Sequence, residues 1–187
     1  MGPRVPEVFP SDLDQRVLLH NLADRFNTVA DHLPLPEQVS ADPALSEILD
    51  DEVRNLARLL GYLTGQHASR HRAAAYYPDQ TTAVHRRVTL ALAEAAEPAG
   101  AALAALGAAV HHLARLTDLT RRRPNPGPDR ARAITAVHRS LLDRLGESRS
   151  QLARAARGLR ANADTRTPPP AIVPAPPTPS ASPSRTR

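Results

Sequence analysis

The sequence contains no cysteine, no tryptophan and no lysine, and these absences narrow what the chain can be. Without cysteine it cannot form a disulfide, a thiolate metal site or a cysteine nucleophile. Only 3% of the 187 residues are aromatic, which argues against a β-sandwich, whose strands favour aromatic and β-branched residues. Alanine and leucine dominate the 41% hydrophobic content, and both favour helices. The composition therefore predicts an all-α protein.

All 24 basic residues are arginine, an excess that codon bias in a high-G+C genome explains in part. The formal net charge of +5 and the pI near 10.8 favour a nucleic-acid or acidic partner. The charge is unevenly distributed: residues 1–66 hold 5 Arg and 11 acidic residues, whereas residues 67–187 hold 19 Arg and 8 acidic residues. Two readings fit this asymmetry, neutralisation between helices of one bundle or association with another copy or partner.

The two ends of the chain are predicted to lie outside the folded domain. Residues 1–10 contain three prolines and lack the basic and apolar regions of a secretion signal, so we expect an irregular lead-in. Residues 165–187 are rich in Pro, Ser and Thr, and we expect a disordered tail that leaves residues 11–164 as the domain. No run approaches the roughly 20 apolar residues of a membrane span. The expectation is a cytoplasmic protein with no membrane partner.

The longest stretch with a helical period extends from Asp79 to Arg123. Its apolar residues alternate spacings of three and four, the pattern of a helix that packs against other helices. At about 1.5 Å per residue the helix is about 66 Å long, too long to be stable alone in water. Pro98 lies within the stripe, and because the spacing continues across it without turn residues, we expect a kinked helix rather than a reversal. The stripe consists of Leu92, Ala96, Ala99, Leu103, Leu106, Val110 and Leu113.

Proline-containing breaks divide the rest of the domain into three further helices. We predict helices near residues 11–33, 43–75, 79–123 and 129–163. The connections are too short for a long crossover, so the predicted fold is an antiparallel up-down-up-down four-helix bundle. The predicted core is Leu22, Phe26, Val53, Leu56, Leu60, Leu92, Leu103, Leu106, Val110, Leu141, Leu145 and Leu152.

Three histidines are predicted to lie near the turn between the second and third helices. His67 and His71 are one helical turn apart, and a turn centred near Tyr77 places His85 at their level. Three imidazole nitrogens and a water can bind Zn²⁺, and a histidine cluster can alternatively sense pH. Neighbouring arginines would repel a cation, so we expect partly exposed histidines and no metal ion. These arginines are Arg70, Arg72, Arg86 and Arg87.

The opposite end of the bundle is predicted to be basic. His111, His112 and His138 are expected to meet there, beside arginines of the third and fourth helices. This surface supports an alternative function, a basic accessory protein that binds nucleic acid without sequence preference. Three aspartates interrupt the basic stripe, and no helix-turn-helix or stacking aromatic accompanies it. The candidate residues are Arg115, Arg121, Arg122, Arg123, Arg130 and Arg132.

No motif in the sequence indicates catalysis. There is no glycine-rich phosphate loop, no GxSxG turn and no inward pair of carboxylates for a di-iron site, so we expect neither an enzyme nor a cofactor nor a small-molecule substrate. The leading hypothesis is a non-enzymatic interaction or scaffold protein that binds a protein partner or a second copy. This hypothesis is based on the third helix, which is longer than the first by roughly 30 Å at ~1.5 Å per residue. Part of its apolar stripe is therefore expected to lack cover within one chain.

Overall fold

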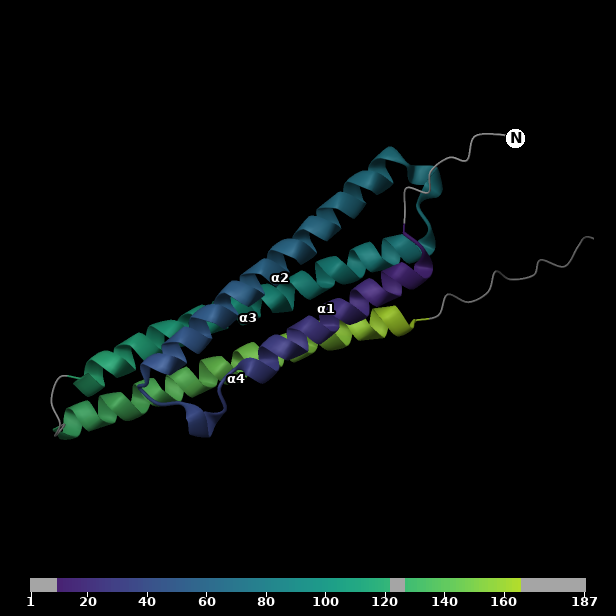
Figure 1. Ribbon diagram of the computed structural model, residues 1–187. Coiled ribbons are helices and arrows are strands. Elements are labelled where there is room, and N and C mark those ends of the chain that lie inside the picture. Colours follow the sequence, from purple (N-terminus) through teal and green to yellow (C-terminus); the bar gives the residue numbers. More distant parts are fainter. Residues whose placement is uncertain (1–9, 122–126, 166–187) are drawn as a thin grey trace, which may run out of the picture.

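The computed structural model describes residues 10–121 and 127–165, and over these residues it contains four α-helices and no strand (Figure 1). The helices are α1 (Asp12–His32), α2 (Pro43–Tyr76), α3 (Ala83–Arg121) and α4 (Pro128–Asp164). Two 3₁₀ turns, η1 (Pro36–Gln38) and η2 (Pro78–Gln80), lie in the first two connections. The tail prediction falls on residues outside the described part of the chain, apart from Thr165.

Helix starts follow local capping chemistry. The Ser11 hydroxyl accepts the backbone N–H of Asp14 while the Asp14 carboxylate accepts the backbone N–H of Ser11, and Asp42 caps α2 ahead of a proline at its first position. The predicted start of the third helix at residue 79 is wrong. Residues 78–80 form the separate turn η2, and α3 begins after Thr82, whose hydroxyl accepts the backbone N–H of His85 at 3.1 Å.

Contacts between the helices confirm the antiparallel up-down-up-down order. Arg160 of α4 reaches Asp24 of α1 at 2.7 Å. The Ser148 hydroxyl of α4 donates to the Ala102 carbonyl of α3 at 3.2 Å. His85 of α3 lies against the turn of α2 that precedes it, with Nε2 3.4 Å from a backbone carbonyl. Successive helices therefore run in opposite directions along one bundle axis (Figure 1).

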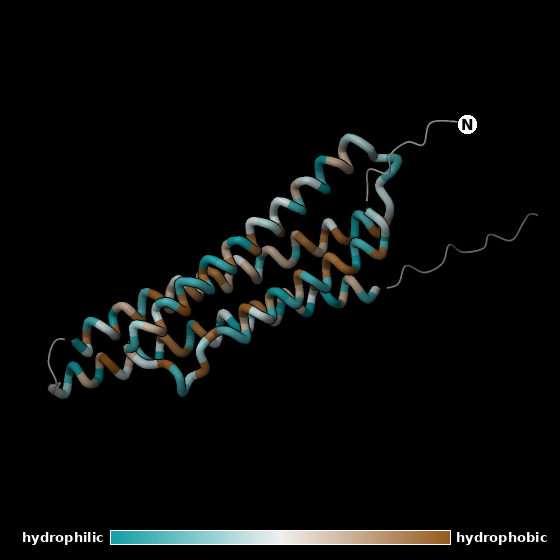
Figure 2. Tube along the Cα trace, viewed as in Figure 1, coloured by the Kyte–Doolittle hydropathy of each residue, from teal (hydrophilic) through white to brown (hydrophobic). Residues whose placement is uncertain are grey.

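One continuous core runs through all four helices, and α3 and α4 are the pair in most extensive contact. Hydrophobic residues recur along each helix (Figure 2). The buried stripe of α3 differs from the predicted one by about one residue. Leu92, Leu106 and Leu113 are buried as expected, but alanines fill the intervening places, because α3 packs between α4 and α2 and alanine lets the helices approach closely. These alanines are Ala91, Ala95, Ala99, Ala102, Ala105 and Ala109.

Four residues of the predicted core are half-buried rather than buried. They pack against the edge of the core, on the flank of their helix rather than at its centre. On α3 the prediction placed larger apolar residues where the contact with α4 takes smaller ones, whereas on α2 the neighbouring Leu56, Leu59 and Leu63 take the central places. The four residues are Val53, Leu60, Leu103 and Val110.

The far end of α3 buries its leucines but also borders a hollow. Leu113 and Leu116 are each 3% exposed, while a hollow of about 570 Å³ between the start of α2 and this end of α3 is lined in part by Val110 and Leu113. The helix continues without interruption through Pro98, which is buried. The kink at Pro98 stays a prediction.

After α1 the chain does not turn back directly into α2. It first continues alongside α4. The guanidinium of Arg149 donates to the backbone carbonyls of Leu33, at 2.7 Å, and of Pro34. Eleven residues earlier on α4, His138 Nε2 donates to the carbonyl of Val39 at 3.2 Å. The chain thus travels roughly 16 Å along α4, at ~1.5 Å per residue, before α2 begins.

One of the described helices, α3, is long and apolar enough to cross a membrane by length and composition alone. Of its most apolar window, 44% is buried inside the bundle. The central helix of a helical bundle passes the same test, because it is apolar on the faces that it buries.

The α3–α4 core can be tested at Leu106, which is fully buried. Replacing Leu106→Ala should lower the free energy of unfolding by about 2–5 kcal/mol, through lost apolar burial and the cavity left behind. Urea melts of the purified protein measure this. The control Leu90→Ala, at a site 58% exposed on the same helix, should change stability by less than about 0.5 kcal/mol. Equal losses at both sites would show that the core has been assigned to the wrong face.

Substitution of Arg149 tests whether its hydrogen bonds hold the connection between α1 and α2 in place. Arg149→Met keeps the aliphatic stem but leaves the carbonyls of buried Leu33 and Pro34 without their charged donor, so we expect a loss of about 1.5–3 kcal/mol. Arg144→Met, which removes only a half-exposed ion pair with Glu147, should cost less than about 1 kcal/mol. Chemical denaturation of both variants gives the comparison. A cost at Arg149 no larger than that at Arg144 would contradict this role.

Candidate functional site

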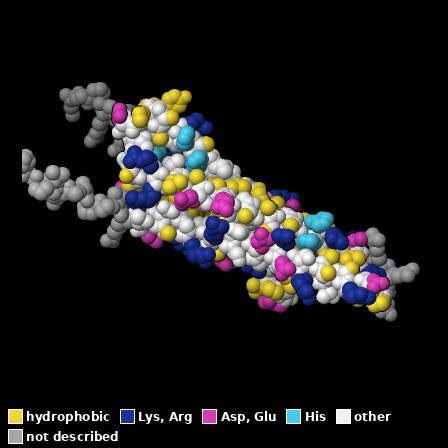
Figure 3. All heavy atoms as spheres, turned by 180° about the vertical axis from the view of Figure 1, so that it is seen from behind, with side chains coloured by type: hydrophobic (Ala, Val, Ile, Leu, Met, Phe, Trp, Pro, Cys, Tyr) yellow, Lys and Arg dark blue, Asp and Glu magenta, His cyan; other side chains and the backbone are white. Residues whose placement is uncertain are grey.

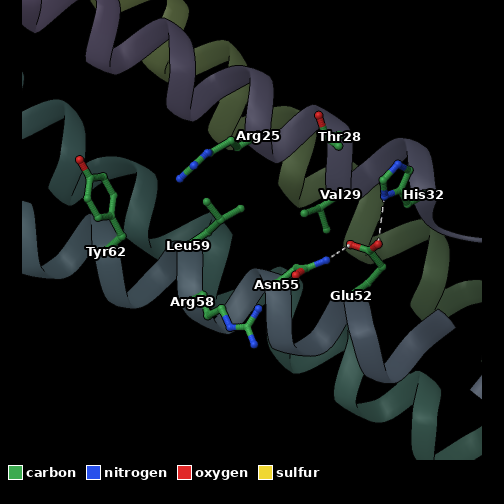
Figure 4. A pocket seen from close by; sticks show the side chains of 9 residues that line it. All are labelled: Arg25, Thr28, Val29, His32, Glu52, Asn55, Arg58, Leu59 and Tyr62. Atoms are coloured by element: carbon green, nitrogen blue, oxygen red, sulfur yellow. Dashed lines mark hydrogen bonds and ion pairs between the residues drawn. The ribbon is translucent and has the colours of Figure 1, made fainter. Parts of the chain in front are cut away.

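One edge of the four-helix bundle is open. The pairs α1–α4, α4–α3 and α3–α2 pack extensively, whereas α1 and α2 touch at few places. Two polar contacts bridge them. The first joins His32 Nδ1 to a Glu52 carboxylate oxygen at 3.1 Å, and the second joins Arg70 Nη1 to the Gln15 amide oxygen at 3.3 Å. The space between these two bridges is called the α1–α2 slot below (Figure 4).

The slot contains two hollows that share part of their lining. The first, of about 460 Å³, lies next to the His32–Glu52 bridge, and the second, of about 420 Å³, continues towards Leu18. Arg25, Thr28 and Tyr62 line both hollows, so the two form one continuous groove along α1. Figure 4 shows Val29 of α1 and Leu59 of α2 facing each other across it, with Tyr62 beside them.

Apolar side chains also occur along the rim of the slot. Tyr62 is 44% exposed and lies within it. Val17 and Ile48, 48% and 43% exposed, precede the slot residues Asn21 and Glu52 by four positions, which places them on the same helix faces. Because the two helices are antiparallel, Val17 lies near the Gln15–Arg70 bridge and Ile48 lies beyond the His32–Glu52 bridge, so these two residues extend the apolar lining at opposite ends of the slot.

The charges in the slot are unbalanced. Its two carboxylates are both engaged: buried Glu52 accepts from His32 and from the Asn55 amide, and Asp24 pairs with Arg160 of α4. In contrast, no carboxylate in the described part of the chain pairs with Arg25 or Arg58. Arg25 extends from α1 into the gap above Leu59 (Figure 4). The slot therefore presents two guanidinium groups that are available to an anion.

The three histidines near the second turn do not form one cluster. The rings of His67 and His71 lie 6.2 Å apart, as expected for one helical turn. His85 is only 1% exposed and directs Nε2 to the carbonyl of Arg70, so Nε2 carries the proton and donates. Within residues 10–121 and 127–165, no group of three or more His, Cys, Asp or Glu is positioned to hold a metal ion.

Arg70 lies in a buried polar layer that joins three helices. It is 8% exposed, donates to Gln15 of α1, and its carbonyl faces His85 of α3. Its Nε has no hydrogen-bond partner, and burial lowers the pKa of its guanidinium. This layer holds α1, α2 and α3 together at this end.

The candidate nucleic-acid residues are partly engaged in the fold. Arg130 donates through Nε to the Leu119 carbonyl at 2.8 Å, at the end of α3, and Arg132 pairs with Asp129 at 2.8 Å. Arg115 and Arg121 are exposed, whereas Arg122 and Arg123 lie outside the described residues. Figure 3 shows basic and acidic side chains interspersed on the face seen there, without a continuous basic stripe. The nucleic-acid alternative stays a prediction.

The histidines near the third turn are partly brought together. The rings of His111 and His112 lie 5.7 Å apart edge to face. Burial lowers the pKa of His112, and the charges of His111, Arg115 and Arg144 lower it further. His138 is occupied with the Val39 carbonyl, where it helps to fix the first connection.

Sequence reasoning did not identify the α1–α2 slot. Arg25 and Arg58 are two of 24 basic residues, and no spacing distinguishes them. Their presence along one groove depends on the register of α1 against α2, which the path of the first connection along α4 sets. Neither arginine interrupts the apolar stripe of its helix, so the periodicity of the sequence does not mark them either.

Stability should depend on pH through His85. Burial lowers its pKa from the ordinary 6.5, the hydrogen bond to the Arg70 carbonyl raises it less, and the charge of Arg70 lowers it. Below pH 6.5 the unfolded chain therefore binds a proton that the folded protein does not, so this contribution is complete above pH 6.5 and is lost as the pH falls.

Urea melts between about pH 7.5 and 5 test this dependence. The free energy of unfolding of the native sequence should decrease as the pH falls. The free energy of unfolding of His85→Gln should decrease less steeply, whatever its value at about pH 7.5. His112→Gln should flatten the profile in the same sense, because its pKa is also lowered. Profiles of His85→Gln and the native sequence that are parallel would contradict the assignment.

The chain matches no protein-family model, no curated protein and no solved structure. The four-helix architecture does not decide between functions, because bundles of this kind carry unrelated activities. The function must therefore be argued from the slot, its apolar floor and its two arginines.

Proposed function

We propose that this protein is a non-enzymatic interaction protein that binds another protein through the α1–α2 slot. The observation that carries the proposal is the open edge itself. Three neighbouring helix pairs of the bundle pack closely, while the fourth leaves a groove whose apolar lining includes exposed Tyr62 of α2 and half-buried Leu18 of α1. An amphipathic helix laid into such a groove covers apolar surface that the chain alone leaves in water.

The residues that line the slot are suited to anchoring rather than to reaction chemistry. Leu59 and Val29 supply an apolar floor, and Tyr62 offers a large rigid ring with a polar tip. Glu52 is 5% exposed and already accepts hydrogen bonds from His32 and Asn55, so its carboxylate stabilises the bridge between α1 and α2. We therefore assign these groups to binding and not to acid–base catalysis.

The chain offers a site-specific test because it has no native cysteine. A photoactivatable crosslinker on Tyr62→Cys sits in the slot, and the same label on Leu90→Cys sits on α3, at a residue that lines neither hollow of the slot. On illumination in an extract of the source cells, the slot label should yield discrete adducts at least about five times more abundant than the control label. Mass spectrometry then identifies the partner, and titration of the two purified proteins measures its affinity.

An adduct between two copies of the chain would identify self-association as the form of the interaction, and light scattering at micromolar concentration would confirm it. Equal labelling from both positions, or no adduct from the slot, would contradict the proposal. Circular dichroism of each labelled variant checks that it is folded, so that misfolding is excluded as the reason for a missing adduct.

A further inference from the structure

We infer that the α1–α2 slot selects an acidic amphipathic helix, about four turns long, of a partner protein. This inference rests on the proposed function and adds the chemistry of the partner. It follows from three properties of the slot: its length between the two polar bridges, its apolar floor, and two arginines that no carboxylate of the described chain neutralises.

The length of the slot suits a helix. The bridges fall at Gln15 and His32 of α1, and at Glu52 and Arg70 of α2. Each pair is 17 or 18 residues apart, so the slot is about 25 Å long at ~1.5 Å per residue. A helix of about 16 residues has the same length. The two hollows follow one another over residues 18–32 of α1 and 52–62 of α2, a stretch longer than a compact small molecule would fill.

The floor of the slot provides the apolar part of the match. Leu18 and Val29 of α1 and Leu59 and Tyr62 of α2 line the two hollows, and they recur at intervals near the helical repeat. A helix with leucines at i, i+3, i+4 and i+7 presents a stripe of the same period. Packing of such a stripe between α1 and α2 would resemble the packing that already exists between α3 and α4.

The charges of the slot favour a negatively charged partner. Glu52 is engaged by His32 and Asp24 by Arg160, so neither is free to attract a basic helix. Arg25 on α1 and Arg58 on α2 carry the charge that remains. Glutamates on the two flanks of a docked helix would face these guanidinium groups, which are well shaped to hold carboxylates.

Charge also disfavours the chain's own tail as the occupant of the slot. The charged residues after Thr165 are all arginine, namely Arg166, Arg185 and Arg187. Like charges disfavour their approach to Arg25 and Arg58. A second copy of the chain remains a distinct occupant, and the experiment below treats it as an outcome.

Two designed peptides of 16 residues, each held helical by a side-chain staple, provide the probe. Both carry the same leucine stripe, and they differ only in having glutamate or lysine on the flanks. Fluorescence anisotropy should show that the glutamate peptide binds the full-length protein at least about tenfold more tightly than the lysine peptide. The difference should shrink as salt rises from about 50 to 300 mM, because the ion pairs are screened.

Substitutions in the protein test whether the preference for the glutamate peptide arises from the slot. The double variant Arg25→Glu, Arg58→Glu should reverse the order of the two peptides. The matched control Arg115→Glu, Arg132→Glu changes the net charge equally but lies away from the slot, and it should preserve the order. Tyr62→Ala should weaken the glutamate peptide at least about fivefold, whereas Tyr76→Ala, at a residue 78% exposed beyond the slot, should not.

The outcomes separate this inference from the proposed function. If crosslinking at Tyr62→Cys identifies a partner but the two peptides bind equally, or neither binds, the acidic-helix inference is wrong and the proposed function stands. If the slot crosslinks to a second copy of the chain, the occupant is that copy and the inference is also wrong. If the slot crosslinks to nothing, the proposed function fails, whatever the peptides do.

Discussion

The close contact between α3 and α4 is the interaction on which the rest of the structure depends. Alanines of α3 face α4 along most of the length of both helices, and the buried Ser148 hydroxyl reaches the backbone carbonyl of Ala102. Small side chains allow this approach because they keep the two backbones near each other while still excluding water. The pair forms a long two-helix platform, and α1 and α2 each pack on a different part of it: α1 on α4, and α2 on α3.

The first connection decides how α1 and α2 face each other. Arg149 and His138 of α4 bind backbone carbonyls of this segment, so the chain follows α4 before it reverses into α2. His32, the last residue of α1, therefore lies opposite Glu52 in the third turn of α2, instead of opposite the start of that helix. Polar contacts hold the two helices at the ends of their overlap, and the slot is the space left between.

The slot combines an apolar lining with two arginines that have no carboxylate partner in the described chain. Elsewhere the arginines at Arg54, Arg144 and Arg160 have carboxylate neighbours, and Arg130 and Arg149 cap or fix backbone carbonyls. Arg25 and Arg58 have neither role, which is also true of exposed Arg115 and Arg139, but unlike these two they line the slot. An arginine-rich composition by itself says little about function, whereas two unneutralised arginines at one groove define a surface with a preferred sign of partner.

The sequence by itself determined the all-α class, the four helices, the caps at Ser11 and Asp42 and the antiparallel order, because apolar period, capping residues and short connections are local properties. It also placed Leu106 and Leu141 in the core. Only the tertiary structure decided which face of α3 is central, since the preference for alanine over Leu103 depends on how close α4 lies. The tertiary structure also decided the slot. The opposition of α1 and α2 follows from bonds that Arg149 and His138 make to residues about a hundred positions away, and no local pattern encodes such a register.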